Sequence, residues 1–203
     1  TPRYVLDRVQ LALYQRRHPQ HPWLTRAMIE WLEPRLRPEH TLVEFGSGRS
    51  TLWFAKRVRR VISCEHHGEW HAEVSRQLRE AGLSNVNYLH VPEEPAGYVA
   101  PAGRALQERG EHQADVILVD GIYRDHCAVW ALDHIRPGGL IIVDNVNWFL
   151  PSRSRAPQSV PEGAPAKNSR WRRFAAVVTG WDCVSTSDGV TDTAAFRAPA
   201  GQP

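Results

Sequence analysis

The stretch TLVEFGSGRSTLWFAKRV, residues 41–58, decides the fold. An apolar run ends at Phe45, a short Gly-Ser-Gly turn follows, and from Ser50 onward apolar residues recur at helical spacing. A buried strand, a tight turn and a helix in this order are typical of nucleotide-binding α/β proteins, in which the turn faces the ligand. The residues of the turn then narrow the choice of ligand.

Two common phosphate sites are excluded by the residues of this turn. A P-loop has four residues between its glycines and ends in Gly-Lys-Ser/Thr, whereas Gly48-Arg49-Ser50 lacks the lysine and a single residue separates the glycines. The dinucleotide fingerprint G-x-G-x-x-G requires a third glycine where Thr51 stands. Glu44, just before the turn, would repel a pyrophosphate and attract a cation.

A second acid follows at the end of the next apolar run, VISCE. This acid is Glu65, and a carboxylate at the end of the second strand accepts hydrogen bonds from the two hydroxyls of a ribose. The residues therefore favour a nucleoside that carries a positive group and no pyrophosphate. S-adenosylmethionine, with its adenosine, sulfonium and α-amino group, has these features.

Predicted strands and helices alternate along the rest of the chain. The apolar runs VILV and LIIV lack polar alternation, which indicates central strands covered on both faces. We expect an α/β fold of the three-layer, Rossmann-like, doubly wound type, with a mostly parallel seven-stranded sheet and an antiparallel last strand. The strands are expected at 41–45, 61–65, 86–91, 114–120 and 140–145, followed by an edge hairpin of WDCVSTS and DTAAFRA.

The 203 residues suit a single domain. We expect residues 1–37 to form a helical cover, with Thr25 as a helix N-cap, and residues 40–147 to form the ligand-binding core. The segment 146–170 is rich in proline, serine and arginine and is predicted to be a substrate loop or lid. A C-terminal helix and hairpin are expected over 171–203, and AGYVAPAGRALQERG, with its internal proline, is expected to be a broken helix or loop.

In combination, the motifs VEFGSGRST, VISCE, ADVILVDG and IRPGGLIIVDN resemble those of the class I S-adenosylmethionine-dependent methyltransferases over about residues 40–147. The resemblance implies this cofactor. It also implies that Glu65 binds the ribose, that His66 lies against the adenine, and that Asp120 and Gly121 close the methyl-donor side. The implied cofactor-binding residues are Glu44, Gly46, Ser47, Gly48, Ser50, Thr51, Glu65, His66, Asp120 and Gly121.

Acidic and amide side chains end two neighbouring predicted strands. Asp120, Asp144 and Asn145 are hard oxygen ligands that suit Mg²⁺, and such a metal would lower the pKa of a substrate hydroxyl. The trio resembles the metal site of the catechol and caffeoyl-coenzyme A O-methyltransferases. Tyr123 stands where those families have a lysine as proton acceptor.

Without that lysine, the catalytic candidates are Asp120, His126 and Arg124. His126 is a candidate base, because imidazole titrates near neutral pH. The alternative is that His126 has no catalytic role and simply lies in the first turn of a helix. Arg124 would either hold an acceptor anion or be an exposed charge. Trp148 and Trp23 are candidate aromatic walls for the substrate or cofactor.

These patterns predict methyl transfer to a small-molecule acceptor, most simply at oxygen, with Mg²⁺ as an optional aid. The alternatives are a nucleic acid or protein acceptor, or a non-catalytic Rossmann-like binding module. A nucleic acid acceptor predicts a basic rim of Arg153, Arg155, Arg170, Arg172 and Arg173.

We do not expect nucleic acid or membrane partners, and a homodimer through residues 1–37 stays open. Three sparse cysteines and no apolar leader favour a cytoplasmic location.

Overall fold

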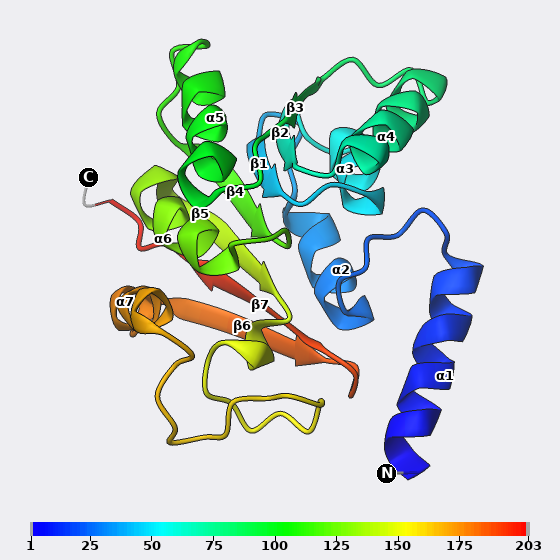
Figure 1. Cartoon of the computed structure of the whole chain (residues 1–203), viewed down its shortest axis with the longest axis vertical. Helices are drawn as coiled ribbons and strands as arrows, with labels where there is room; N and C mark the ends of the chain where they lie inside the picture. Colours follow the sequence, from blue (N-terminus) through cyan, green and yellow to red (C-terminus); the bar gives the residue numbers. More distant parts are fainter. Residues whose placement is uncertain (1, 202–203) are drawn as a thin grey trace.

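The computed structural model describes residues 2–201, which form a seven-stranded sheet with helices on both faces (Figure 1). The strand order is β3-β2-β1-β4-β5-β7-β6. The strands are β1 (Thr41–Phe45), β2 (Arg60–Glu65), β3 (Val86–His90), β4 (Ala114–Val119), β5 (Ile135–Asp144), β6 (Asp182–Ser187) and β7 (Asp192–Arg197). The helices are α1 (Pro2–Arg17), α2 (Arg26–Leu32), α3 (Arg49–Ala55), α4 (Gly68–Glu80), α5 (Pro95–Gln107), α6 (Arg124–His134) and α7 (Ser169–Val178), with short 3₁₀ turns η1 (Glu33–Arg35) and η2 (Val146–Trp148).

The sheet has the predicted direction pattern. Strands β1 to β5 pair in parallel, whereas β7 pairs antiparallel with both β5 and β6. The predicted α/β class, the seven strands and the antiparallel last strand are therefore confirmed. The carboxyl ends of β1, β2, β4 and β5 meet at one edge, where parallel α/β sheets bind their ligands.

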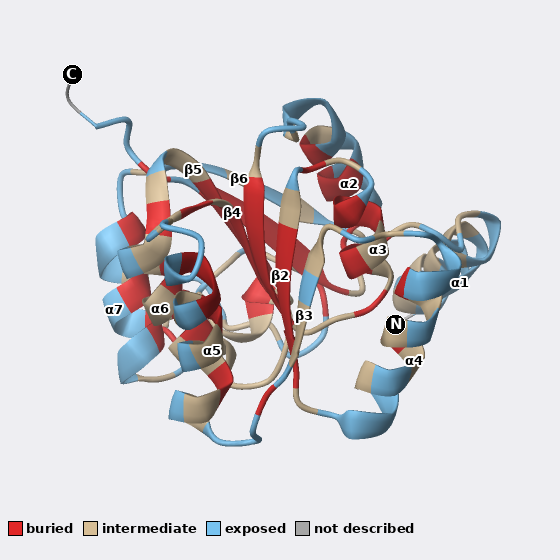
Figure 2. Ribbon diagram, turned by 90° about the horizontal axis from the view of Figure 1, so that it is seen from above, coloured by how far each residue is buried: buried red, intermediate tan, exposed pale blue. Residues whose placement is uncertain are grey.

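Two hydrophobic cores cover the two faces of the sheet, and both are visible as buried segments in Figure 2. Helices α5, α6 and α7 pack on one face, and α2 and α3 pack on the other. Along β1, Val43 and Phe45 belong to the first core, whereas Leu42 belongs to the second. Because side chains alternate along a strand, Glu44 shares the face of Leu42 and points toward α3.

One local prediction is wrong: residues 95–107 form a continuous helix, α5, with Pro101 inside it. Tyr98, Ala102 and Leu106 recur at helical spacing and are fully buried against the sheet. The apolar surface buried on this face outweighs the one backbone hydrogen bond that a proline removes.

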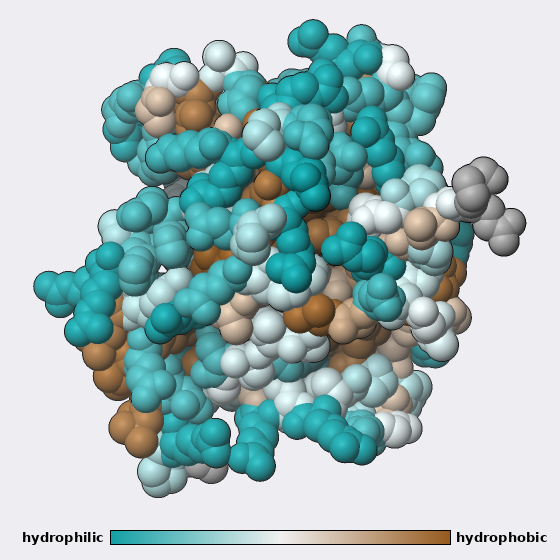
Figure 3. All heavy atoms as spheres, turned by 180° about the vertical axis from the view of Figure 1, so that it is seen from behind, coloured by the Kyte–Doolittle hydropathy of each residue, from teal (hydrophilic) through white to brown (hydrophobic). Residues whose placement is uncertain are grey.

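The two N-terminal helices differ in how they contact the rest of the protein. Thr25 precedes α2 as predicted but makes no side-chain cap; its hydroxyl instead bonds Thr186 Oγ1 on β6 at 2.5 Å. Helix α1 has no buried residue, and Figure 1 shows it at the periphery. Its apolar side chains Val5, Leu6, Val9 and Leu13 are exposed, and apolar atoms are seen along the same edge in Figure 3.

Among residues 2–201, no helix has the length and apolar composition needed to cross a bilayer.

Candidate cofactor and catalytic site

The turn after β1 contacts the turn after β4 through two glycines. Gly46 has a φ of +91°, a conformation that glycine adopts without strain. A Cβ on Gly46 would lie 2.6 Å from the Cα of Gly121, and a Cβ on Gly121 would lie 2.0 Å from the hydroxyl of Tyr98. The two backbones therefore approach closely because neither residue has a side chain, and a backbone cradle forms at the ends of β1 and β4.

Replacing Gly121 with Ala is expected to destabilise the fold by about 1–3 kcal/mol, the usual cost of overpacking. At this chain length the melting temperature should fall by roughly 2–4 °C for each kcal/mol. Gly103 is the matched control, since its nearest contact for a Cβ is 3.7 Å away and Gly103→Ala should not lower stability. Thermal unfolding of both variants checks this; an unchanged melting temperature in Gly121→Ala would show that the cradle is not tightly packed.

Glu44 supports the turn from behind and does not line the ligand pocket. Its carboxylate accepts hydrogen bonds from Thr51 Oγ1 at 2.5 Å and from Ser63 Oγ at 2.7 Å. Thr51 Oγ1 in turn accepts from the backbone N–H of Gly48. Burial raises the pKa of Glu44 to about 7. This network fixes the start of α3, so Glu44 shapes the turn from which the predicted cofactor residues project.

Glu65 faces the turn from the end of β2. One oxygen accepts from the backbone N–H and the hydroxyl of Ser47, at 3.2 and 2.9 Å. The other accepts from the backbone N–H of His67 at 2.9 Å and lies 3.1 Å from His66 Nδ1. The Ser47 hydroxyl also bonds that of Tyr88 at 2.6 Å. A buried carboxylate is thus held at the point where the sequence predicts ribose recognition.

These residues open onto a cavity of about 580 Å³ at the carboxyl edge of the sheet. The volume is that of an ordinary small-ligand site. Six predicted cofactor residues line it: Gly46, Ser47, Glu65, His66, Asp120 and Gly121. The other four predicted cofactor residues, Glu44, Gly48, Ser50 and Thr51, are not among the residues that line this cavity.

Several other residues that line this cavity were not predicted from the sequence. Tyr98 comes from the segment predicted to be broken, and Val190 and Thr191 come from the turn between β6 and β7. From α1, the lining residues are Arg8, Leu11 and Gln15, whose spacing of three and four puts them on one helix face. This spacing could have been recognised in the sequence, but it does not predict which part of the protein this face of α1 contacts. Trp23 and Trp148 line the cavity too, as predicted.

Asp120, Asp144 and Asn145 come together at the far end of the cavity, and Arg124 lies among them. The guanidinium donates to Asp120 Oδ1 at 2.8 Å and to Asn145 Oδ1 at 2.6 Å. Asp144 is held from another side, because its Oδ1 accepts from Thr193 Oγ1 at 2.6 Å. The side chain of Asn145 also donates to Thr191 Oγ1.

These residues do not fit a resident Mg²⁺ in the arrangement observed. Two of the three predicted ligand residues, Asp120 and Asn145, each direct a side-chain oxygen at a cation that the protein itself supplies. Within residues 2–201, moreover, no three His, Cys, Asp or Glu side chains form a group suited to a metal ion. The predicted metal site is therefore unsupported, and no catalytic step is derived through it.

Burial shapes the protonation of the two carboxyl groups. Burial raises the pKa of Asp120, and the charge of Arg124 partly opposes this rise. Burial raises the pKa of Asp144 further, with the charge of Asp120 adding to the effect. Two carboxyl groups so close to one cation titrate as a pair, with pKa values above the ordinary range of aspartate.

His126 does not line the cavity. It lies in the first turn of α6, and its ring meets that of Tyr123 at 6.1 Å between centroids. The structure thus brings Asp120 and Arg124 of the three catalytic candidates into the cavity and places His126 outside its lining.

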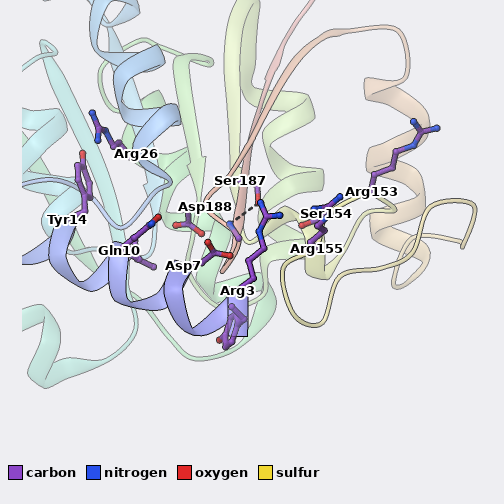
Figure 4. A pocket seen from close by; sticks show the side chains of 13 residues that line it. Arg3, Asp7, Gln10, Tyr14, Arg26, Arg153, Ser154, Arg155, Ser187 and Asp188 are labelled. Atoms are coloured by element: carbon purple, nitrogen blue, oxygen red, sulfur yellow. Dashed lines mark hydrogen bonds between the residues drawn. The ribbon is translucent and has the colours of Figure 1, made fainter. Parts of the chain in front are cut away.

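A second hollow, of about 960 Å³, lies between α1, the loop 153–155 and the turn between β6 and β7 (Figure 4). It is larger than the first but contains none of the motif residues. Leu11 lines both hollows, which makes them neighbours. The larger hollow is lined by charged residues of both signs, including Arg3, Asp7 and Arg155.

Comparison with known proteins assigns the chain to a family. The family model described as "Methyltransferase domain" matches residues 43–146, just over half of the chain. The chain belongs to this methyltransferase family. S-adenosylmethionine is the cofactor of the family, and the protein is an S-adenosylmethionine-dependent methyltransferase. No curated protein matches the methyltransferase by sequence.

Solved structures share the fold of the methyltransferase. A proposed caffeoyl-CoA O-methyltransferase from Staphylococcus aureus is 14% identical with a TM-score of 0.59, over 97% of this chain and 98% of that one. A precorrin 8W decarboxylase from Methanobacterium thermoautotrophicum is 21% identical with a TM-score of 0.54, over 90% and 95% of the two chains. An rRNA methylase from Streptococcus thermophilus is 11% identical with a TM-score of 0.53, over 85% and 93%. At these identities the likeness shows the fold and leaves the acceptor open.

Proposed function

We propose that the methyltransferase transfers the methyl group of S-adenosylmethionine to an oxygen atom of a small-molecule acceptor. The observation that carries this proposal is that Glu65, the Gly46–Gly121 cradle and the carboxyl group of Asp120 line one cavity. Glu65 would take the ribose hydroxyls, and the cradle would let the methionine part approach the backbone. The acceptor would then meet the methyl group beside Asp120.

In this proposal each residue has a simple task. Bound S-adenosylmethionine supplies an electrophilic methyl group. Asp120 accepts the proton of the acceptor hydroxyl, because a neutral hydroxyl is a weak nucleophile. Oδ1 of Asp120 already accepts from Arg124, and no described residue bonds Oδ2, which leaves that oxygen for the acceptor. The cavity walls, Trp148 among them, orient the acceptor in line with the methyl group.

Acidic neighbours offset the charge of two of the five arginines that a nucleic acid would use, which favours a small acceptor. Of the five arginines expected to form a basic rim, Arg153 is paired with Glu162 at 2.7 Å, and Arg170 lies 3.7 Å from Asp125. Pairing reduces the positive field that a phosphate backbone would need. We also propose a cytoplasmic location, which the three unpaired cysteines support.

The acceptor class is tested by incubating the protein with S-adenosylmethionine and panels of hydroxylated small molecules, amines and total RNA, and measuring S-adenosylhomocysteine release. We expect release with one class of hydroxylated compound. Release with RNA alone, falling steeply as salt is added, would replace this proposal by nucleic-acid methylation.

A further inference from the structure

Arg124 uses its entire hydrogen-bonding capacity inside the protein. A guanidinium has five N–H donors, and five protein acceptors surround this one. Nε donates to the carbonyl oxygen of Gly121 at 3.0 Å, and Nη1 donates to the carbonyl oxygen of Asp144 and to Asn145 Oδ1, both at 2.6 Å. Nη2 donates to the carbonyl oxygen and to Oδ1 of Asp120, at 2.9 and 2.8 Å.

This saturation decides between the two roles that the sequence left open for Arg124. No donor remains for a carboxylate or phosphate of an acceptor, so the guanidinium does not hold the substrate. The residue is not an exposed charge either, since its side chain is only 16% exposed. Its five bonds join the end of β4 to the end of β5, the two segments that a metal ion bound by Asp120, Asp144 and Asn145 would join.

The backbone around this arginine is also specialised. Tyr123 and Asn145 have positive φ values of 48° and 51°, next to the two strand ends that Arg124 joins. Such conformations are uncommon for residues other than glycine and cluster at functional sites. They lie at the start of α6 and in the turn after β5, so both segments that Arg124 joins leave their strands through uncommon backbone conformations.

We propose that Arg124 is a positioning residue that takes the place of a divalent cation, so that the protein holds Asp120 toward the acceptor without a bound metal. This inference rests on the proposed function. A Mg²⁺ ion at the same oxygens would have to displace the guanidinium and would face its positive charge.

The test compares the wild type with Arg124→Ala and Arg124→Lys, using thermal unfolding with and without millimolar MgCl₂. The wild type should show no Mg²⁺-dependent rise in melting temperature, whereas Arg124→Ala, whose oxygens are freed, should show one. Arg124→Lys should show a smaller rise, because its ammonium still blocks the oxygens but has only three donors. Arg136→Ala is the matched control: Arg136 pairs with Asp115 at the opposite edge of the sheet, and its loss should create no Mg²⁺ response.

Two further readouts separate positioning from mere folding. Arg124→Ala should still bind S-adenosylhomocysteine, and its turnover should fall about 10- to 100-fold, as for residues that orient a reactive group. Added Mg²⁺ should partly restore that turnover, and EDTA should leave wild-type turnover unchanged. Wild-type turnover that EDTA abolishes and Mg²⁺ restores would overturn the inference, as would a Mg²⁺-dependent stabilisation of the wild type. If the wild type fails to bind S-adenosylhomocysteine, the proposed function fails instead.

Discussion

Replacing Glu65 with Ala is expected to weaken S-adenosylhomocysteine binding by about 100-fold or more. Hydrogen bonds to a charged group contribute about 1.5–3 kcal/mol each, and a ribose offers two hydroxyls to this carboxylate. The change also removes the acceptor of both Ser47 bonds, so the turn after β1 loses its anchor. Isothermal titration calorimetry of the purified variant measures the effect.

The control for this prediction is Glu69→Ala. Glu69 is an exposed carboxylate in the first turn of α4, four residues from Glu65, and its removal should leave binding unchanged. Glu65→Gln should lie between the two, because an amide keeps one acceptor oxygen and loses the charge. Unaltered affinity in Glu65→Ala would mean that the nucleoside lies elsewhere in the cavity.

The second large effect is expected from Asp120→Asn, with turnover reduced about 10²- to 10³-fold and S-adenosylhomocysteine affinity nearly unchanged. General-base catalysis contributes about this much, and an amide cannot accept the proton. Asparagine keeps an oxygen for Arg124, so the bonds around the guanidinium should persist. Steady-state kinetics with an acceptor from the small-molecule panel measures the loss. Asp133→Asn, which changes an exposed carboxyl group on α6, is the control.

Asp120 also predicts the pH dependence of the reaction. The base must be ionised, so kcat/KM should rise with pH through the pKa of Asp120 and reach a plateau above it. Because burial raises this pKa above the usual 3.8, the rise should occur at a higher pH than for an ordinary carboxyl group and be absent in Asp120→Asn. A wild-type profile that is flat between pH 5 and 8, or an Asp120→Asn variant with full turnover, would remove Asp120 from the chemistry.

The sequence predicts the sheet and the ligand edge well because both depend on local patterns. Apolar runs fix the strands, and the Gly46 turn and Glu65 follow from strand ends that a parallel sheet places side by side. Glu44 was assigned to the ligand although side-chain alternation from Val43 and Phe45 could have placed it on the opposite face. Contact between Glu44 and the cofactor therefore stays a prediction, and the structure shows only that Glu44 is absent from the cavity lining.

The cluster around Arg124 shows where sequence reasoning stops. Asp120, Asp144 and Asn145 were correctly predicted to meet, and Arg124 stands four residues after Asp120. Yet the five acceptors of Arg124 come from two strand ends and include three backbone carbonyl groups, whose directions depend on the backbone dihedrals of both turns. No residue pattern specifies those directions.

Roles that depend on contacts between copies or on bound acceptor stay predictions. Residues 146–170 as a lid and 1–37 as a cover or homodimer surface are of this kind. Helix α1 lines the cavity with Arg8, Leu11 and Gln15, while Val5, Leu6, Val9 and Leu13 are exposed. Sedimentation of the purified protein would decide whether that apolar face joins two copies.

Binding of the cofactor product is measured by calorimetric titration of the wild-type protein with S-adenosylhomocysteine, carried out with Mg²⁺ and again with EDTA. We expect one site per chain with low-micromolar affinity, and the same affinity in both buffers. Absence of binding by demonstrably folded protein in both buffers would contradict the assignment of the cavity to this cofactor.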